Sequence, residues 1–305
     1  MIKRTLYFGN PAYLSLKLGQ IVITKPSESG SESQDADVRT LPIEDVGVVV
    51  LDNKQITMTQ ALLEMLLANN CAVITCDSRH LPVGLMLPLA GNTIQNERFR
   101  AQIDASLPLK KQLWQQTVRS KIRNQAAVLE YVHGNPAKNM LLWADDVKSG
   151  DKDNMEARAA AFYWKTLFPE EDDFYRDQDG DGLNALLNYG YAILRAVVAR
   201  SLVCCGLLPT LGIHHHNRYN AYCLADDIME PYRPYVDRLV YDVRGELPAD
   251  NGLNRAVKQK LLGIPVIEVV INGSRSPLMN AVFQTTSSLV KCFGGENKKI
   301  AYPIM

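Results

Sequence analysis

One segment in the last third of the chain holds an unusual density of side chains able to bind a metal ion. Three consecutive histidines, residues 214–216, precede a stretch with helical spacing that carries Asp226, Asp227 and Glu230. Residues three or four apart share one face of a helix, so Glu230 can lie beside either aspartate. A loop histidine next to such carboxylates predicts an ion site with oxygen and imidazole ligands. A solvated acidic helix face is the plainer interpretation, but it does not explain three histidines.

A further carboxylate, Glu156, stands at the front of the alanine-rich stretch 154–164. Small side chains there would allow another helix or a nucleic-acid backbone to approach closely. Taken alone, a glutamate on such a helix is ordinary and predicts only a solvated face. A chemical role for Glu156 therefore requires that the fold bring it to the histidine segment.

The two segments together, EARAAAFYW and LGIHHHNRYNAYCLADDIMEPYRPYVD, resemble the CRISPR-associated spacer-acquisition integrases. These are the larger, catalytic subunits of the adaptation complex. The amino-acid sequence of the second segment is most similar to members from type II systems. The resemblance covers essentially the whole chain, with both motifs in order. It implies a metal-dependent DNA integrase and endonuclease that inserts protospacer DNA into CRISPR arrays.

The same resemblance implies which residues bind the metal ion and act in catalysis. Glu156 heads a motif of the form E-small-x-Ala-Ala, His215 ends a Gly-x-x-His turn, and Glu230 belongs to a D-x-M-E-P segment. Two alternatives stay open, one for the histidine and one for the second carboxylate: His214 or His216, and Asp226 or Asp227.

The implied reaction explains these residue types. A DNA 3′-hydroxyl attacks a backbone phosphate, and a divalent ion offsets the charge that develops and orients both oxygens. Carboxylates favour Mg²⁺ or Mn²⁺, and the imidazole moves the preference toward Mn²⁺. Transesterification conserves the energy of the phosphodiester bond, so no nucleotide cofactor is expected. In agreement, the sequence has no GxxxxGK[ST] phosphate loop.

The resemblance also implies partners. The substrates would be double-stranded DNA, both protospacer and CRISPR repeat, and two homodimers would clamp a small partner dimer into a heterohexamer. Lys plus Arg equals Asp plus Glu, at 33 each, so we expect the isolated chain to bind DNA weakly. Eleven basic residues are candidates for DNA contacts: Arg98, Arg100, Lys110, Lys111, Arg119, Lys121, Arg123, Arg195, Arg200, Arg233 and Arg238.

Hydrophobic patterns along the chain predict an α+β fold: a small N-terminal β-rich domain followed by a larger all-α catalytic domain. We expect the β-rich domain over residues 1–78, a linker over 79–94 and the helical domain over 95–305. Residues 13–18 alternate with period two and precede a hairpin partner, and 46–51 form an apolar strand. Helical spacing covers five later segments: 95–132, 153–168, 183–207, 223–241 and 250–262.

Shorter patterns add local expectations. Thr57 and Gln60 have the spacing of a capping box, residues 26–38 form a polar loop, and Val266–Ile271 form a strand with a short partner. The stretch 177–184 opens like a calcium loop, but the twelfth position is an asparagine, which favours a polar turn before a helix.

The composition bounds location and class. The apolar stretch 183–208 carries Asn188, Arg195 and Arg200, so it predicts a core helix and no membrane span. Six cysteines without a CxxC pair, and a first segment unlike a signal peptide, favour a reducing cytoplasm. Two other functions remain as alternatives: a catalytically silent DNA-binding scaffold of the same complex, and a metal phosphodiesterase unrelated to CRISPR.

Overall fold

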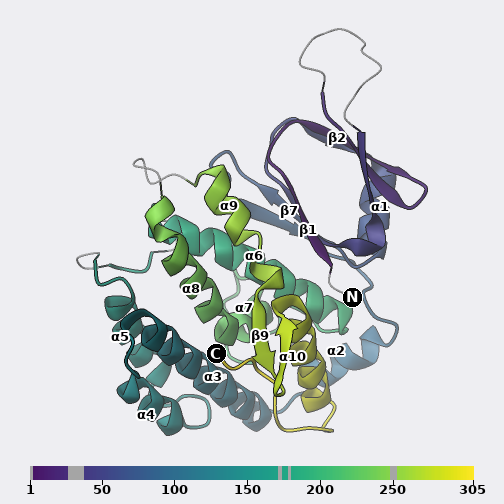
Figure 1. Ribbon diagram of the computed structural model, residues 1–305. Helices are drawn as coiled ribbons and strands as arrows, with labels where there is room; N and C mark the ends of the chain where they lie inside the picture. Colours follow the sequence, from purple (N-terminus) through teal and green to yellow (C-terminus); the bar gives the residue numbers. More distant parts are fainter. Residues whose placement is uncertain (1–2, 27–37, 171–173, 178–179, 248–252) are drawn as a thin grey trace. The chain divides into compact units, whose positions relative to one another are not determined.

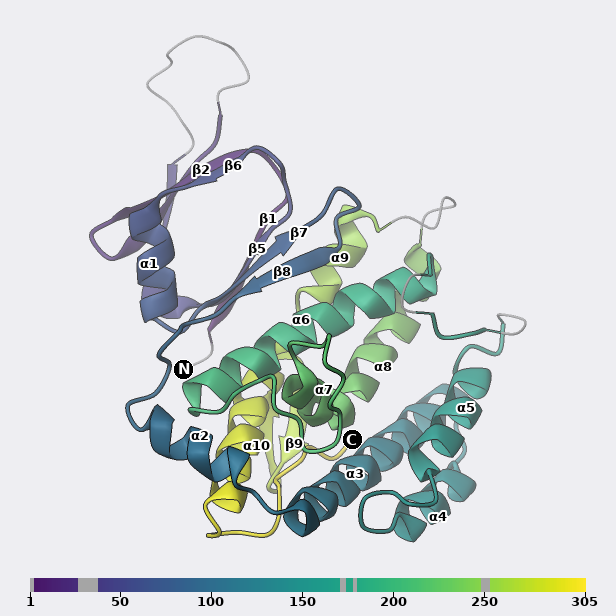
Figure 2. The same cartoon turned by 180° about the vertical axis from the view of Figure 1, so that it is seen from behind.

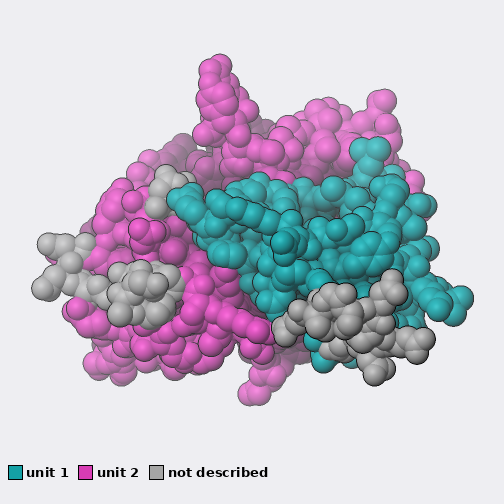
Figure 3. Space-filling model, turned by 90° about the horizontal axis from the view of Figure 1, so that it is seen from above, with its two compact units in different colours: residues 1–91 teal, residues 92–305 magenta. Residues whose placement is uncertain are grey.

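Strands dominate the first 91 residues and helices dominate the rest. The computed structural model describes residues 3–26, 38–170, 174–177, 180–247 and 253–305 (Figure 1). The chain separates into two compact units, Met1–Gly91 and Asn92–Met305, which Figure 3 distinguishes by colour. Except for its two end residues, the polar stretch 26–38 lies outside the described residues.

The first unit contains two four-stranded sheets. The first has the order β1-β5-β7-β8, with β1, β5 and β7 parallel and β8 antiparallel to β7. The second has the order β4-β3-β2-β6. Their bounds are β1 Arg4–Phe8, β2 Ala12–Lys17, β3 Gln20–Thr24, β4 Val38–Pro42, β5 Val46–Leu51, β6 Ile56–Met58, β7 Ala72–Cys76 and β8 Pro82–Met86.

The predicted hairpin and the predicted strand 46–51 are confirmed as β2–β3 and β5. Leu14, Ile21 and Val49 belong to the apolar core of this unit, together with Leu62 of helix α1 (Gln60–Ala68). The capping-box prediction is wrong: Thr57 pairs with β2 as part of β6, and Thr59 caps α1.

The predicted linker 79–94 is only partly a connection. Strand β8 forms within it and pairs with Ile74 and Thr75 of β7, so the sheet extends eight residues beyond the predicted boundary at residue 78. A proline is tolerated at the first residue of an edge strand, where its missing N–H breaks no ladder bond. Pro82 occupies that position, and its presence made the segment resemble a linker.

In its described residues the second unit is helical apart from one hairpin, so the predicted fold class is confirmed. The hairpin joins β9 (Glu268–Ile271) to β10 (Ser274–Pro277), as expected for residues 266–271. The α-helices are α2 Gln95–Ile103, α3 Leu107–His133, α4 Lys138–Asp146, α5 Met155–Leu167, α6 Leu183–Cys204, α7 Cys223–Met229, α8 Arg233–Val243, α9 Arg255–Leu261 and α10 Leu278–Phe293.

Helix α6 is the buried centre of this unit, and α7, α8 and α10 all contact it. This confirms the prediction of a core helix. None of the helices in the described ranges combines the length and apolar character that crossing a bilayer requires. Helices α3, α4 and α5 lie side by side (Figure 2). The calcium-like stretch 177–184 lies partly outside the described residues, and α6 follows it.

The end of the chain is tied to helix α3. The buried Asn124 donates its amide hydrogens to the carbonyls of Pro231, at 2.8 Å, and Pro303, at 3.1 Å. Its carbonyl oxygen accepts the N–H of Met305 at 3.1 Å. One side chain of α3 therefore connects the segment after α7 with the C-terminal residues.

Candidate active site

The histidine segment wraps around one buried carboxylate, that of Asp227. Its Oδ2 accepts the backbone N–H of Ile213 at 2.7 Å and of His214 at 2.9 Å. Its Oδ1 accepts the N–H of His215 at 3.2 Å and lies 2.5 Å from the Nδ1 of the same residue. Asp227 is fully buried, so this loop supplies the polar partners that a buried carboxylate requires. Asp227 therefore positions the loop and is unavailable as a simple metal ligand.

Close packing fixes the path of this loop. A Cβ added to Gly212 would lie 2.2 Å from the carbonyl oxygen of His215 and 2.7 Å from Asp227 Oδ2, so only glycine fits. The ring of His214 stacks on the buried Trp114 of α3, with centroids 4.2 Å apart. His216 is exposed, and its Nδ1 contacts the carbonyl of His214. These contacts direct two of the three histidines away from the pocket described below.

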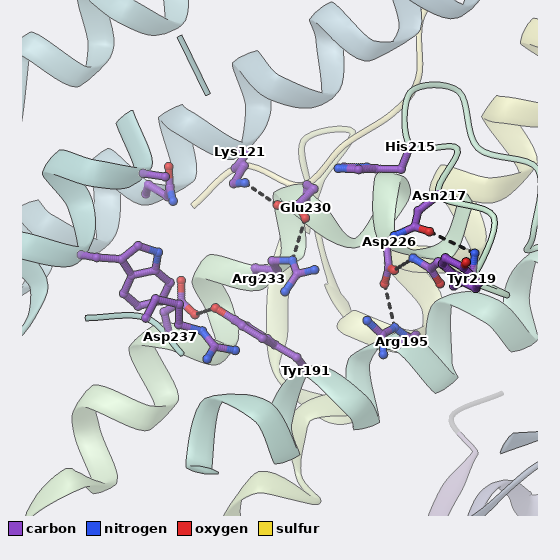
Figure 4. A pocket seen from close by; sticks show the side chains of 15 residues that line it. Lys121, Tyr191, Arg195, His215, Asn217, Tyr219, Asp226, Glu230, Arg233 and Asp237 are labelled. Atoms are coloured by element: carbon purple, nitrogen blue, oxygen red, sulfur yellow. Dashed lines mark hydrogen bonds and ion pairs between the residues drawn. The ribbon is translucent and has the colours of Figure 1, made fainter. Parts of the chain in front are cut away.

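His215 is the histidine that lines the pocket shared with Glu230 (Figure 4). Because Asp227 engages Nδ1, the second ring nitrogen, Nε2, is left to face outward. The hydrogen bond to Asp227 raises the pKa of His215 above its usual value. Burial instead lowers the pKa of His214. Of the three histidines, His215 is thus the one that lines the pocket with Glu230, and its role as a metal ligand stays a prediction.

Glu156 is positioned by the start of helix α5. The carboxylate of Asp151 accepts the N–H groups of Met155, at 2.9 Å, and Glu156, at 3.0 Å, and so satisfies the first turn. The Glu156 side chain reaches α3, where its Oε1 lies 2.7 Å from Lys121 Nζ. Side-by-side packing of α3 and α5 therefore brings this distant glutamate to the site.

Glu230 stands between α7 and α8, at the head of the short 3₁₀ turn Glu230–Tyr232. It lies between two cations: Lys121 Nζ is 2.5 Å from its Oε2, and Arg233 Nε is 2.8 Å from its Oε1 (Figure 4). Burial alone would raise the pKa of Glu230, but Arg233 and Lys121 lower it to about 2. Burial would likewise lower the pKa of Lys121, and Glu230 and Glu156 raise it instead. Both groups are therefore held in their charged forms.

Asp226, the remaining alternative for the second carboxylate, has other partners. Its Oδ1 lies 2.7 Å from Arg195 Nε, and its Oδ2 accepts a hydrogen bond from Asn220 at 2.7 Å. It lines the same pocket as Glu230 (Figure 4). Among the acidic residues of this segment, Glu230 is the one that shares a cation with Glu156.

Two of the three predicted ligands, His215 and Glu230, line one pocket of about 640 Å³ together with Lys121. Glu156 joins them through Lys121. In the described parts of the chain, no three His, Cys, Asp or Glu side chains already stand at metal-ligand spacing. The ammonium of Lys121 holds the two carboxylates around a single positive charge. Two carboxylates that converge on a cation, beside an imidazole, form a donor set suited to Mg²⁺ or Mn²⁺.

Another buried carboxylate, that of Asp237, lies at the other end of the pocket (Figure 4). It accepts hydrogen bonds from the hydroxyls of Tyr163, at 2.9 Å, and Tyr191. Burial raises the pKa of Asp237 to about 7, although both tyrosines counteract this. Tyr191 also carries the guanidinium of Arg233 above its ring, 4.5 Å from the centroid. This cluster supports Arg233 and, through it, Glu230.

Several basic residues considered for DNA contacts have protein partners instead. Arg119 and Arg123 do share a face of α3, but they meet the backbone carbonyl and the carboxylate of Asp145. Arg98 donates to the carbonyl of Cys205 at 2.6 Å. Lys121, Arg195 and Arg233 all line the pocket. Sequence reasoning missed Trp114 and Asp237, whose roles depend on long-range contacts. It also missed Asp151, although this aspartate lies just before the helix whose first turn it caps.

Comparison with known proteins agrees with this geometry. The sequence profile of the family described as CRISPR associated protein Cas1 matches residues 6–247. The chain belongs to the Cas1 family. The CRISPR-associated endonuclease Cas1 of Neisseria meningitidis serogroup C (strain 8013) is 37% identical over 303 residues, which cover 98% of this chain and 95% of the relative. The family expected from the two motifs is thereby confirmed.

Solved structures share the fold of this Cas1-family chain. A casposase bound to an integration product superimposes with a TM-score of 0.78 at 21% identity, covering 98% of this chain and 92% of the casposase. A Cas6-RT-Cas1–Cas2 complex gives a TM-score of 0.74 at 20% identity, covering 97% of this chain and 35% of the matched chain. These similarities extend over both units described above.

Proposed function

We propose that this chain is a metal-dependent DNA integrase and endonuclease that inserts protospacer DNA into CRISPR arrays. The observation that carries the proposal is the convergence of Glu156 and Glu230 on one positive charge beside His215. Membership of a family whose relatives are named endonucleases supports it, as does the likeness to a casposase bound to an integration product.

In this proposal Glu156, His215 and Glu230 hold Mg²⁺ or Mn²⁺. The ion would polarise the scissile phosphate and stabilise the leaving 3′-oxygen. The protein's contribution is to keep the donors ready. Lys121 and Arg233 keep Glu230 ionised, and Asp227 fixes which nitrogen of His215 faces the pocket. In this proposal the DNA backbone enters the pocket lined by His215, Glu230 and Arg195.

The direct test is strand transfer of a short duplex with free 3′-hydroxyls into a supercoiled plasmid that carries a CRISPR array. The reaction contains Mn²⁺ and the small partner protein. Wild type is compared with Glu156→Ala, His215→Ala and Glu230→Ala. His216→Ala and Glu97→Ala are matched controls, because both residues are exposed and outside the pocket.

We expect activity in wild type and both controls and its loss in the three site variants. Loss in the carboxylate variants alone would move the histidine ligand to another residue. Equal activity in all proteins would overturn the site assignment. If wild type bound DNA but joined no strands under any metal, the catalytically silent DNA-binding scaffold would replace the integrase.

We also propose that the chain acts as a homodimer and that two homodimers assemble with a small partner dimer on double-stranded DNA. The solved Cas6-RT-Cas1–Cas2 complex supports a partner of this kind. Mass photometry of the chain alone, and then with its small partner, is expected to show a dimer and then a heterohexamer. A mass that stays at the dimer with the partner present would contradict this assembly.

A further inference from the structure

Lys121 is a largely buried lysine that lies between two carboxylates. Its Nζ lies 2.7 Å from Glu156 and 2.5 Å from Glu230, and the side chain is only 12% exposed. The two carboxylates come from helix α5 and from the turn after α7, so the ammonium joins elements far apart in the sequence. Without it, two largely buried carboxylates would face each other.

The same two carboxylates are the ones assigned above to a divalent ion, and this inference rests on that assignment. An ion that binds both glutamates must approach the place where Nζ now lies. A doubly charged ion and an ammonium repel each other strongly at such distances in a poorly solvated site. Lys121 therefore cannot keep both of its present contacts once the ion is bound.

A count of charges indicates where the lysine goes. Glu156 and Glu230 contribute two negative charges, and Lys121 and Arg233 contribute two positive ones, so the group sums to zero. The neighbouring Asp226–Arg195 pair balances itself. A divalent ion would leave this group with two excess positive charges. Phosphodiester groups of DNA, with one negative charge each, would offset this excess.

We propose that Lys121 is a mobile counter-ion that exchanges its carboxylate partners for DNA phosphate when the metal ion binds. The Lys121 side chain can turn from the carboxylates into the pocket, because it lines the pocket together with Arg195 and Arg233 (Figure 4). The lysine stabilises the metal-free site and competes with the ion. It then contributes a cation to the DNA surface only after the ion has arrived. Metal and DNA binding are thereby coupled, each strengthening the other.

The test measures Mn²⁺ affinity directly, by the electron paramagnetic resonance signal of free Mn²⁺, with and without a short 3′-hydroxyl duplex. The proteins are wild type, Lys121→Met, Lys121→Gln and Lys121→Arg. Lys165→Met is the matched control, because Lys165 is an exposed lysine on the helix that carries Glu156. Glu156→Ala reports whether the ion occupies the assigned site.

Without DNA, we expect both uncharged variants to bind Mn²⁺ about tenfold more tightly than wild type, within the usual range of coupling between sites. Lys121→Arg and Lys165→Met should retain the wild-type affinity. The duplex should tighten Mn²⁺ binding to wild type about fivefold or more, and less in the uncharged variants. Thermal unfolding adds a second measure: Mn²⁺ should raise the Tm of Lys121→Met by more than that of wild type.

The outcomes separate this inference from the proposed function. If Glu156→Ala abolishes Mn²⁺ binding but the uncharged Lys121 variants bind no more tightly than wild type, Lys121 is a static structural cation and the inference fails alone. If Glu156→Ala binds Mn²⁺ as wild type does, the carboxylate pair is not the ion site and both proposals fail. Lys121→Gln keeps an amide donor for one carboxylate, so it provides a folded variant if Lys121→Met is unstable.

Discussion

The two halves of the candidate site are held in different ways. The imidazole half is held by hydrogen bonds: Asp227 gathers three backbone N–H groups and the ring of His215, and Gly212 allows the close approach. The carboxylate half is held by charge, with Lys121 and Arg233 around Glu230. Hydrogen bonds to a buried acceptor fix one geometry, whereas ion pairs can exchange partners. One half is therefore prepared in advance, and the other is able to respond to a ligand.

Asp227→Asn should damage the imidazole half most. An amide nitrogen cannot accept a loop N–H, so one side of the loop loses its partner. We expect strand transfer to fall by about 100-fold, as for the removal of partners that orient metal ligands. The free energy of unfolding should fall by about 1–3 kcal/mol for an unsatisfied buried donor. Asp104→Asn, in an exposed connection, is the control. Wild-type activity in Asp227→Asn would show that the loop is not held by this carboxylate.

Gly212→Ala tests the same half through packing. The new Cβ would meet the His215 carbonyl oxygen at 2.2 Å, and that oxygen belongs to backbone that cannot move freely. We expect a loss of about 1–3 kcal/mol in the free energy of unfolding, as for other overpacked positions. Urea denaturation measures it. In Gly245→Ala the added Cβ meets nothing within 4 Å, so stability there should stay near wild type. Equal stability of the two variants would contradict a tightly packed loop.

The free energy of unfolding should depend on pH through Asp237, which supports the carboxylate half. Burial raises its pKa to about 7 in the folded chain, against 3.8 for the ordinary group. Between pH 4 and 7 the folded state keeps a proton that the unfolded chain has released, so stability falls as pH rises. Asp237→Asn should remove up to about 1.4 kcal/mol of this fall per pH unit.

Urea denaturation of metal-free protein from pH 4.5 to 7.5 measures the difference between wild type and Asp237→Asn. Asp242→Asn, whose carboxylate is exposed, serves as the control for loss of an aspartate. A difference that does not change with pH would mean that Asp237 is ionised throughout this range.

Trp114→Phe should change strand transfer only slightly. The variant keeps a ring but reduces the stack on His214. We expect the weaker stack to lower the free energy of unfolding by about 1 kcal/mol or less, the usual size of an aromatic pair. Strand transfer should fall slightly. Trp143→Phe removes an indole that packs on Phe162, outside the pocket, and should leave strand transfer unchanged. Equal activity of the two variants would show that the stack does not help to place the histidines.

Sequence patterns predicted the parts of this site that depend on residue type and local spacing. Glu156, His215 and Glu230 stand in recognisable motifs; the fold brings Glu156 and Glu230 to Lys121, beside the pocket that His215 and Glu230 line. Their role as metal ligands stays a prediction. The pattern could not separate Asp227 from a metal ligand, because spacing on a helix is the same for both roles. What distinguishes it is burial under three backbone N–H groups. Lys121 was one of eleven basic candidates, and only the packing of α3 against α5 identifies it.

In the fold, too, elements with a strong local pattern were predicted and elements that depend on long-range contacts were not. Hairpin β2–β3, strand β5 and helix α6 follow from strong periodicity. Helix α10 was not predicted, because a run of Thr and Ser interrupts its apolar pattern. Thr285 and Thr286 are nevertheless buried, with hydrogen bonds to Tyr232 and Ser201. Polar residues that find buried partners remove the periodic signal on which a sequence prediction depends.

The C-terminal residues have a practical consequence for preparing the protein. Asn124 lies one helical turn from Lys121 on α3 and holds both Pro303 and Met305. Trimming the last three residues would leave that buried amide with Pro231 as its remaining partner among these contacts. A truncation that removes Pro303 and Met305 would therefore disturb the helix that carries Lys121. Preparations that differ only at the C-terminus should not be compared for metal affinity as if they were the same protein.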